Sequence, residues 1–141
     1  MYVMRFKCIL LLALFAGACL AASDTVTLRG KLTQAEGKPP ALTTADGKVI
    51  PLEGDKSTSG VLNDNRLAGA EIELRGHFSG ELFQVDPIHT HAMHVHKEGQ
   101  RLVITYWCAT CSIRTYAPGL CWCCQQETAL DLREPDKDEQ E

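Results

Sequence analysis

The sequence predicts an all-β protein that ends in a cysteine-rich appendage. Short stretches of alternating apolar and polar residues recur between turn residues, and this period of two is typical of strands. Five of the seven cysteines lie between residues 108 and 124. At 141 residues, the chain is long enough for one compact unit with a single core.

The N-terminal residues predict export. An apolar run from Cys8 to Leu20 follows two basic residues, which is typical of a signal peptide over residues 1–22 and too short for a membrane-spanning helix. Residues 15–19 (FAGAC) resemble a bacterial lipoprotein box, although Ala16 stands where such boxes most often have Leu. Two outcomes therefore remain open in the periplasm or cell envelope: a soluble chain, or a chain carrying a lipid on Cys19.

Charge argues against a nucleic-acid partner. Without the leader, the chain carries 12 basic and 18 acidic residues, a formal charge of −6. The basic residues are scattered among acidic ones, whereas binding to phosphate backbones needs clustered Lys and Arg. We therefore expect an unknown protein or small-molecule partner.

Three strands are predicted in the first part of the exported chain. Residues 25–32 alternate strictly, and residues 41–45 and 48–52 flank Asp46-Gly47, a dipeptide suited to a two-residue hairpin turn. Pro51 cannot donate to a ladder, so it predicts a sheet edge or a strand end there.

A weak helix and a second hairpin follow. Ser57 to Arg66 is the one segment here with a helical pattern, and residues 71–78 and 81–85 are strands joined at Ser79-Gly80. This order resembles the OB-fold, a small Greek-key barrel with a helix between its third and fourth strands, and also small exported bacterial proteins of that fold. The resemblance implies a closed barrel over residues 23–91.

OB-folds often stack bases on aromatic side chains of their middle strands. Residues 41–52 contain no Phe, Tyr or Trp. We therefore predict that the barrel serves as a scaffold and does not bind oligonucleotides.

A histidine-rich segment follows the barrel. Imidazoles suit zinc or copper, and the sulfur of Met93 adds copper(I) character. In a regular strand the first two histidines face one way and the last two the other, so one shared site needs a bend near Ala92-Met93. Solvent-facing positions and metal ligands are the two interpretations. The four histidines are His89, His91, His94 and His96.

A further hairpin is predicted to lead into the cysteines. Residues 97–100 form its turn and residues 101–107 its second strand. If His96 lies opposite Arg101, a continued ladder brings Cys108 opposite His89, which makes a mixed Cys and His site conceivable.

Two Cys-x-x-Cys pairs, separated by nine residues, form the strongest chemical signal of the chain. The predicted ligands are Cys108, Cys111, Cys121 and Cys124, with Cys123 as an alternative for the fourth place. The segment resembles a compressed zinc ribbon, and this implies a structural zinc whose four thiolates leave no open position. Copper is the alternative metal.

Two other interpretations of the cysteines remain open. An oxidising compartment favours disulfides, and five cysteines leave one unpaired. Trp107 to Cys111 is similar to the active site of thioredoxin-like proteins, which implies a thiol-disulfide protein using Cys108 and Cys111. However, only thirty residues follow Cys111, and most of a thioredoxin-like fold follows its motif.

The sequence as a whole predicts a non-enzymatic protein, because no catalytic constellation can be located. We expect an all-β chain with an OB-like Greek-key barrel, a β-hairpin and a zinc-knuckle appendage over residues 92–133, and a disordered acidic tail over residues 134–141. Its predicted role is a binding or structural module at the bacterial cell envelope. The alternative is periplasmic handling of zinc or copper by the cysteines and the histidine run together.

Overall fold

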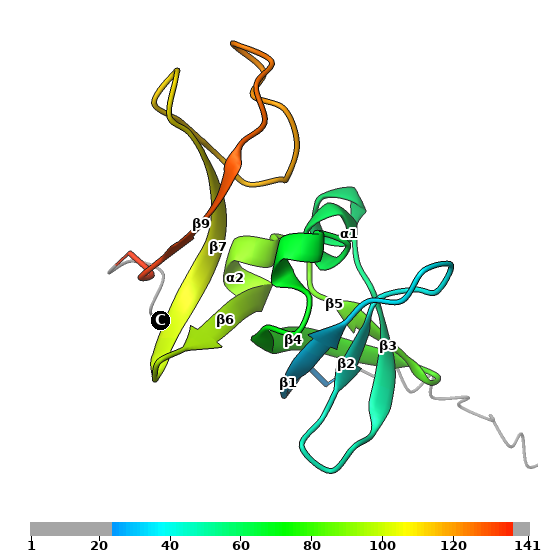
Figure 1. Cartoon of the computed structure of the whole chain (residues 1–141). Coiled ribbons are helices and arrows are strands. Elements are labelled where there is room, and N and C mark those ends of the chain that lie inside the picture. Colours follow the sequence, from blue (N-terminus) through cyan, green and yellow to red (C-terminus); the bar gives the residue numbers. More distant parts are fainter. Residues whose placement is uncertain (1–23, 137–141) are drawn as a thin grey trace, which may run out of the picture.

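The computed structural model describes residues 24–136. The predicted leader, Cys19 and residues 137–141 of the predicted tail lie outside this range. The described strands belong to one sheet, and the first five of them close into a barrel (Figure 1). These five are β1 (Val26–Thr33), β2 (Ala41–Thr43), β3 (Val49–Glu53), β4 (Glu71–Ser79) and β5 (Leu82–Val85).

The barrel has the order β1-β2-β3-β5-β4, and β4 pairs back with β1. The pairing of β3 with β5 is parallel, and the other four pairings are antiparallel. The all-β fold class and the OB-like order are therefore confirmed. Closure leaves none of these short strands with a fully unpaired edge.

Strand β4 joins the barrel to the rest of the sheet. One edge of β4 pairs with β1, while β5 pairs with the C-terminal half of the other edge and β6 (Met93–Lys97) with its N-terminal half. At Gly76, where β1 and β5 both approach, an added Cβ would lie 2.0 Å from the carbonyl oxygen of Gln84. Glycine is therefore required for closure at this point.

Helix α1 (Lys56–Leu62) closes one end of the barrel with Val61 and Leu62, both fully buried. Asp55 caps the helix, because its carboxylate accepts the backbone N–H of Thr58 at 2.8 Å. A short 3-10 helix, η1 (Asn65–Leu67), follows. The predicted helix over Ser57 to Arg66 is thus present as two pieces. Each buried aliphatic side chain here contributes roughly 1.5–3 kcal/mol of burial free energy.

One of two local predictions needs correction. The first hairpin has a three-residue loop: Thr44 N–H donates to the Lys48 carbonyl at 2.9 Å, and Gly47 alone in the loop has a positive φ, of 84°. Pro51 lies inside β3, at a position where the strand is paired with β2 on one side and unpaired on the other, because β5 pairs with β3 only from Leu52 onward. The predicted free edge is therefore present at Pro51, and no ladder bond is missing.

The hairpin that leads into the cysteines has the predicted register. Strand β7 (Gln100–Cys108) pairs with β6, and His96 lies opposite Arg101. Glu98 and Gly99 both have positive φ, of 53° and 79°, which a tight two-residue turn requires. Strand β9 (Ala129–Arg133) pairs with the other edge of β7, and β8 (Ile113–Thr115) pairs with its last residues.

The histidine segment is not one regular strand. His89–Ala92 form a single helical turn, α2, and β6 starts only at Met93. The ladder between β6 and β7 therefore ends at His94 and Val103, and Cys108 does not face His89. Among the helices of residues 24–136, none has the length and apolar character to cross a membrane.

Candidate metal centre

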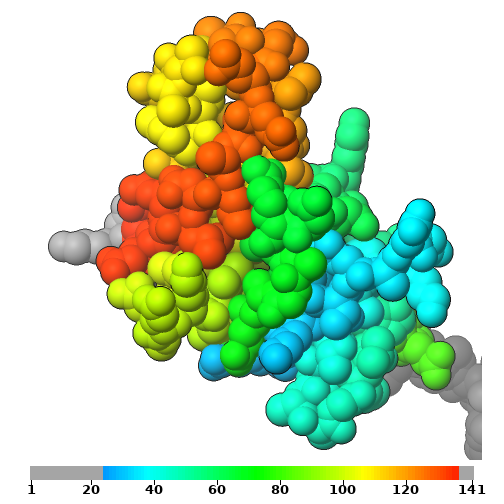
Figure 2. Space-filling view, viewed as in Figure 1, coloured from blue at the N-terminus to red at the C-terminus, as the bar shows by residue number. Residues whose placement is uncertain are grey.

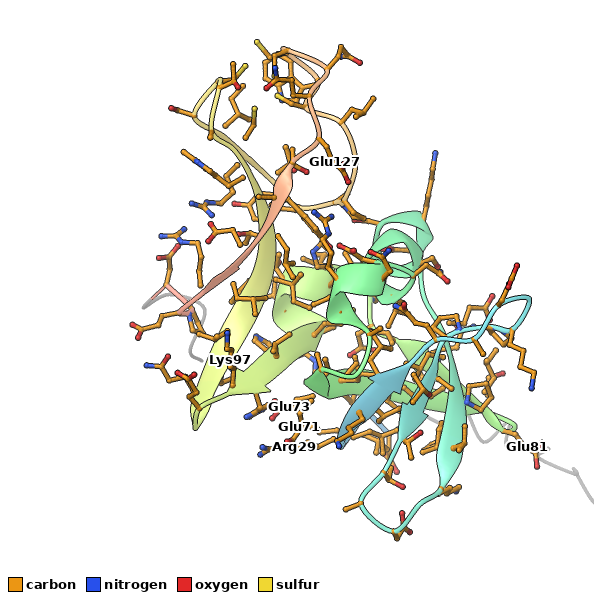
Figure 3. All side chains as sticks on the ribbon, viewed as in Figure 1. Arg29, Glu71, Glu73, Glu81, Lys97 and Glu127 are labelled. Atoms are coloured by element: carbon orange, nitrogen blue, oxygen red, sulfur yellow. The ribbon has the colours of Figure 1, made fainter. Side chains whose placement is uncertain are left out.

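Residues 108–128 form a lobe at the end of β7 that points away from the barrel (Figures 1 and 2). Cys108 is the last residue of β7, and the chain turns there so that Ile113 of β8 pairs with it. The segment that follows returns to β9 through an isolated bridge between Leu120 and Glu127. Each Cys-x-x-Cys pair thus occupies its own tight turn. In Figure 3, sulfur atoms gather at the far end of this lobe, beyond Glu127.

The two turns have the same backbone design. The residue after each pair, Ser112 and Gln125, has a left-handed φ, of 53° and 59°. The backbone N–H groups of Thr110 and Cys111 are directed at the sulfur of Cys108. Those of Cys123 and Cys124 are directed in the same way at Cys121. Such N–H donors stabilise a thiolate, so both turns are preorganised to hold negative sulfur.

The four sulfur atoms of Cys108, Cys111, Cys121 and Cys124 lie within 4.8 Å of one another. Those of Cys108 and Cys124 are 3.5 Å apart. Zn–S bonds of about 2.3 Å in a tetrahedron place sulfur atoms ~3.8 Å apart, so the cluster has the size that one such ion needs. These four cysteines could therefore hold a metal ion. The described cysteines are free thiols.

The pKa values of the clustered cysteines also favour binding of a cation. The N–H groups of Cys124 and Cys123 lower the pKa of Cys121 to about 7. The neighbouring thiols of Cys123 and Cys124 raise the pKa of Cys111 far above its ordinary value. The N–H donor of Cys111 lowers the pKa of Cys108, but burial and the thiols of Cys124 and Cys121 together outweigh it, so this pKa is also raised. Without a cation, the crowding of the sulfurs therefore opposes ionisation of Cys108 and Cys111. A divalent ion would remove that penalty.

The lobe has almost no apolar interior. Within residues 109–128, the buried residues are Cys121 and Thr128. The side chains of Leu120 and Trp122 are 63% and 72% exposed. A segment that buries so little cannot be held by the hydrophobic effect and needs cross-links.

The histidines lie apart from this cluster. His89 and His94 are buried, so the interpretation of the histidines as solvent-facing is wrong for these two. His91 is exposed, and His96 lies 2.9 Å from a carboxylate oxygen of Glu73. Glu73 also pairs with Arg101 at 3.1 Å, next to the Arg29–Glu71 pair seen in Figure 3. Within residues 24–136, the potential metal ligands that lie close enough together to share one ion are the four cysteines Cys108, Cys111, Cys121 and Cys124.

A buried polar network joins the lobe to the barrel. Tyr106, fully buried on β7, donates its hydroxyl to Asp64 at 2.9 Å. Arg66 forms three side-chain hydrogen bonds with the same carboxylate and donates to the Thr128 carbonyl at 2.7 Å. The sequence does not indicate this network, because Tyr106 lies 42 residues from Asp64 and Thr128 lies 62 residues from Arg66, and no local pattern links them.

A second feature that the sequence did not indicate lies beside α1. Asp55, Ile88, His89 and Tyr116 line part of a shallow cavity of about 450 Å³. The Nε2 atom of His89 has no hydrogen-bond partner, and Ile88 has a left-handed φ of 65°, which is unusual for a β-branched residue. Burial lowers the pKa of His89, although the Ile104 backbone and the Asp55 carboxylate favour its charged form.

No family model matches the chain, and neither the curated proteins nor the solved structures include a significant match.

Proposed function

We propose that this chain is an exported module of the bacterial cell envelope whose C-terminal lobe is organised by one structural zinc ion. Cys108, Cys111, Cys121 and Cys124 are its ligands, and the barrel is the scaffold that carries the lobe. The lobe presents Leu120 and Trp122 to solvent as contact residues for a partner.

One observation carries the proposal: four sulfur atoms lie within 4.8 Å of one another in a lobe that has almost no buried apolar surface. Disulfides would link the cysteines two by two, whereas the cluster keeps all four sulfurs mutually close. Four thiolates also fill a tetrahedral coordination sphere, which favours a structural over a catalytic ion.

The same geometry ranks the alternatives. Metal handling by cysteines and histidines together is disfavoured, because none of the four histidines joins the cluster among the described residues. Thiol-disulfide chemistry at Cys108 is disfavoured, because that residue ends a strand and its pKa is raised. A reactive thiol needs a helix N-terminus or a nearby cation to lower its pKa.

Metal analysis of matched variants tests the zinc site. The purified, reduced chain should retain about one zinc per molecule. Cys121→Ser should lose it, whereas Cys123→Ser, two residues away, should keep it. Replacing all four histidines of the run with Gln should leave the stoichiometry unchanged. Absence of zinc from the reduced and folded chain, or copper in its place, would contradict the assignment.

Removing the metal tests its structural role. A chelator should abolish protection from amide hydrogen exchange in residues 109–128 and leave the barrel strands protected. Unchanged protection in the lobe would show that the ion does not organise it. Intact-mass measurement of the chain from a bacterial envelope fraction tests export, since it reports leader removal and any lipid on Cys19 together.

A further inference from the structure

The shallow cavity beside α1 lies where the barrel meets the lobe. Asp55 and Ser57 line it at the start of α1, and Tyr116, which follows β8, lines it from the lobe. The remaining lining residues are Ile88, His89 and Thr90, at the start of α2. Its volume of about 450 Å³ is within the range of sites for small ligands.

His89 contributes an unsatisfied polar atom to this cavity. Its side chain is 3% exposed, and its Nε2 atom has no hydrogen-bond partner among the described residues. Buried polar atoms nearly always have a partner, so this exception calls for an explanation. Burial lowers the pKa of His89, so the imidazole is neutral at neutral pH and its Nε2 atom adds a hydrogen-bonding position without positive charge. A ligand with a polar group would satisfy this atom.

The residue before His89 has an unfavourable backbone. Ile88 has a φ of 65° and a ψ of 77°, a left-handed conformation that β-branched residues rarely adopt. Its side chain is 63% exposed at the rim of the cavity, so burial of this side chain does not explain the conformation. Backbone strain of this kind recurs at ligand clamps and switch regions. Because Ile88 adjoins His89, relief of the strain on binding provides a way to uncover the Nε2 atom.

The charge and the rim of the cavity define the class of ligand. Among the described residues that line it, Asp55 is acidic and none is Lys or Arg; Lys56 lines the neighbouring cavity along α1. The N–H of Thr58 lowers the pKa of Asp55, so the carboxylate is charged at neutral pH. Its Oδ1 atom accepts that N–H, and a carboxylate has further acceptor sites for a second donor. The exposed ring of Tyr116 adds an aromatic face, which attracts cations.

We propose that this cavity binds an alkylammonium group, a primary amine on an apolar chain. The ammonium donates to the Asp55 carboxylate and to the Nε2 atom of His89, and the alkyl chain lies against Ile88 and Tyr116. A free amine and the lysine side chain of a peptide share this chemistry. The site goes beyond the proposed zinc centre and requires no metal at the cysteines.

Titration of the full chain with n-hexylammonium, followed by NMR of the histidine side chains, tests the site. Binding should shift the imidazole signals of His89 and leave those of His77 unchanged, since His77 does not line the cavity. Hexanol and hexanoate have the same chain without the positive charge and should bind at least about tenfold more weakly. Nα-acetyl-lysine amide distinguishes the two sources: tighter binding than hexylammonium identifies a peptide lysine, and weaker binding a free amine.

Matched variants locate the binding. Asp55→Asn should weaken hexylammonium binding at least about tenfold and keep α1 capped, because Asn caps helices as well as Asp does. Asp46→Asn removes a carboxylate from the loop between β2 and β3, well away from α1 (Figure 1), and should leave binding unchanged. Tyr116→Ala should weaken binding about two- to fivefold.

Three results overturn the site: no His89 shift with hexylammonium, equal affinity of Asp55→Asn and wild type, or hexanol or hexanoate binding as tightly as the amine. Metal analysis is independent of this titration, so the alkylammonium site and the zinc site can fail separately.

Discussion

The hydroxyl of Tyr106 provides a measurable link in the network between barrel and lobe. In Tyr106→Phe, the ring stays buried and keeps its contact with the Arg66 guanidinium, which lies 5.2 Å from the ring centroid. The lost interaction is the hydrogen bond to the Asp64 carboxylate at 2.9 Å. A hydrogen bond to a charged group contributes about 1.5–3 kcal/mol. Because Arg66 still satisfies the carboxylate, we expect the lower end of this range, about 1.5–2 kcal/mol.

Urea denaturation of the reduced chain measures this loss as a lower midpoint with an unchanged slope. Tyr116→Phe is the matched control, because its side chain is 55% exposed and its change should fall within about 0.5 kcal/mol of wild type. The Asp64→Asn and Tyr106→Phe double-mutant cycle should give a coupling energy of about 1 kcal/mol or more. A Tyr106→Phe chain as stable as the control would refute the energetic role of this network.

Three further predictions concern the pH dependence and backbone of the fold. Burial, followed by the charge of Arg101, lowers the pKa of His94 to about 4. The unfolded chain therefore binds this proton more readily than the folded chain. The free energy of unfolding should fall as the pH drops from about 6.5 towards 4, by at most on the order of 3 kcal/mol. NMR titration should give that low midpoint for His94. Urea midpoints should show a smaller pH dependence in His94→Gln but not in His91→Gln, and the part that remains is due to His89, whose pKa burial also lowers. An ordinary midpoint for His94 would contradict the burial argument. Ile88→Asn should stabilise the chain by about 1 kcal/mol in thermal unfolding, because Asn tolerates the left-handed φ of 65°; no gain would mean that this backbone is unstrained. Gly76→Ala should cost more than about 2 kcal/mol of stability or prevent folding. Gly60→Ala in α1 should stabilise the chain by about 0.5–1 kcal/mol, because its new Cβ meets only ordinary contacts. Equal effects of the two changes in circular-dichroism melts would contradict the crowding at Gly76.

The barrel and the hairpin of β6 and β7 could be predicted because their determinants are local. Strict alternation in β4 follows directly from its one buried face. The register of β6 and β7 follows from the Glu98-Gly99 turn, since both residues take a positive φ and this fixes which residues face each other. Cysteine spacing likewise predicted which sulfurs meet, because each pair is confined to one turn.

The helical turn α2 could not be predicted, because its causes are distant in sequence. Its N-cap residue, Ile88, has no capping side chain, and no local pattern in residues 89–92 favours a helix. The turn forms because burying His89 and Ala92 against the barrel outweighs the local cost at Ile88. The same reason separates the histidines, since α2 interrupts the strand on which the predicted faces depended.

The two halves of the chain are stabilised by different means, and one contact shows how weakly they are coupled. The barrel rests on a buried apolar core, whereas the lobe buries little. Between them, the hydrogen bond from Arg66 to the Thr128 carbonyl contributes on the order of 1 kcal/mol, against the roughly 10 kcal/mol or more that the proposed tetrathiolate zinc would contribute. For the proposed site, the energy of metal binding therefore stays largely within residues 108–128. We expect loss of the ion to open the lobe while the barrel beneath it remains folded.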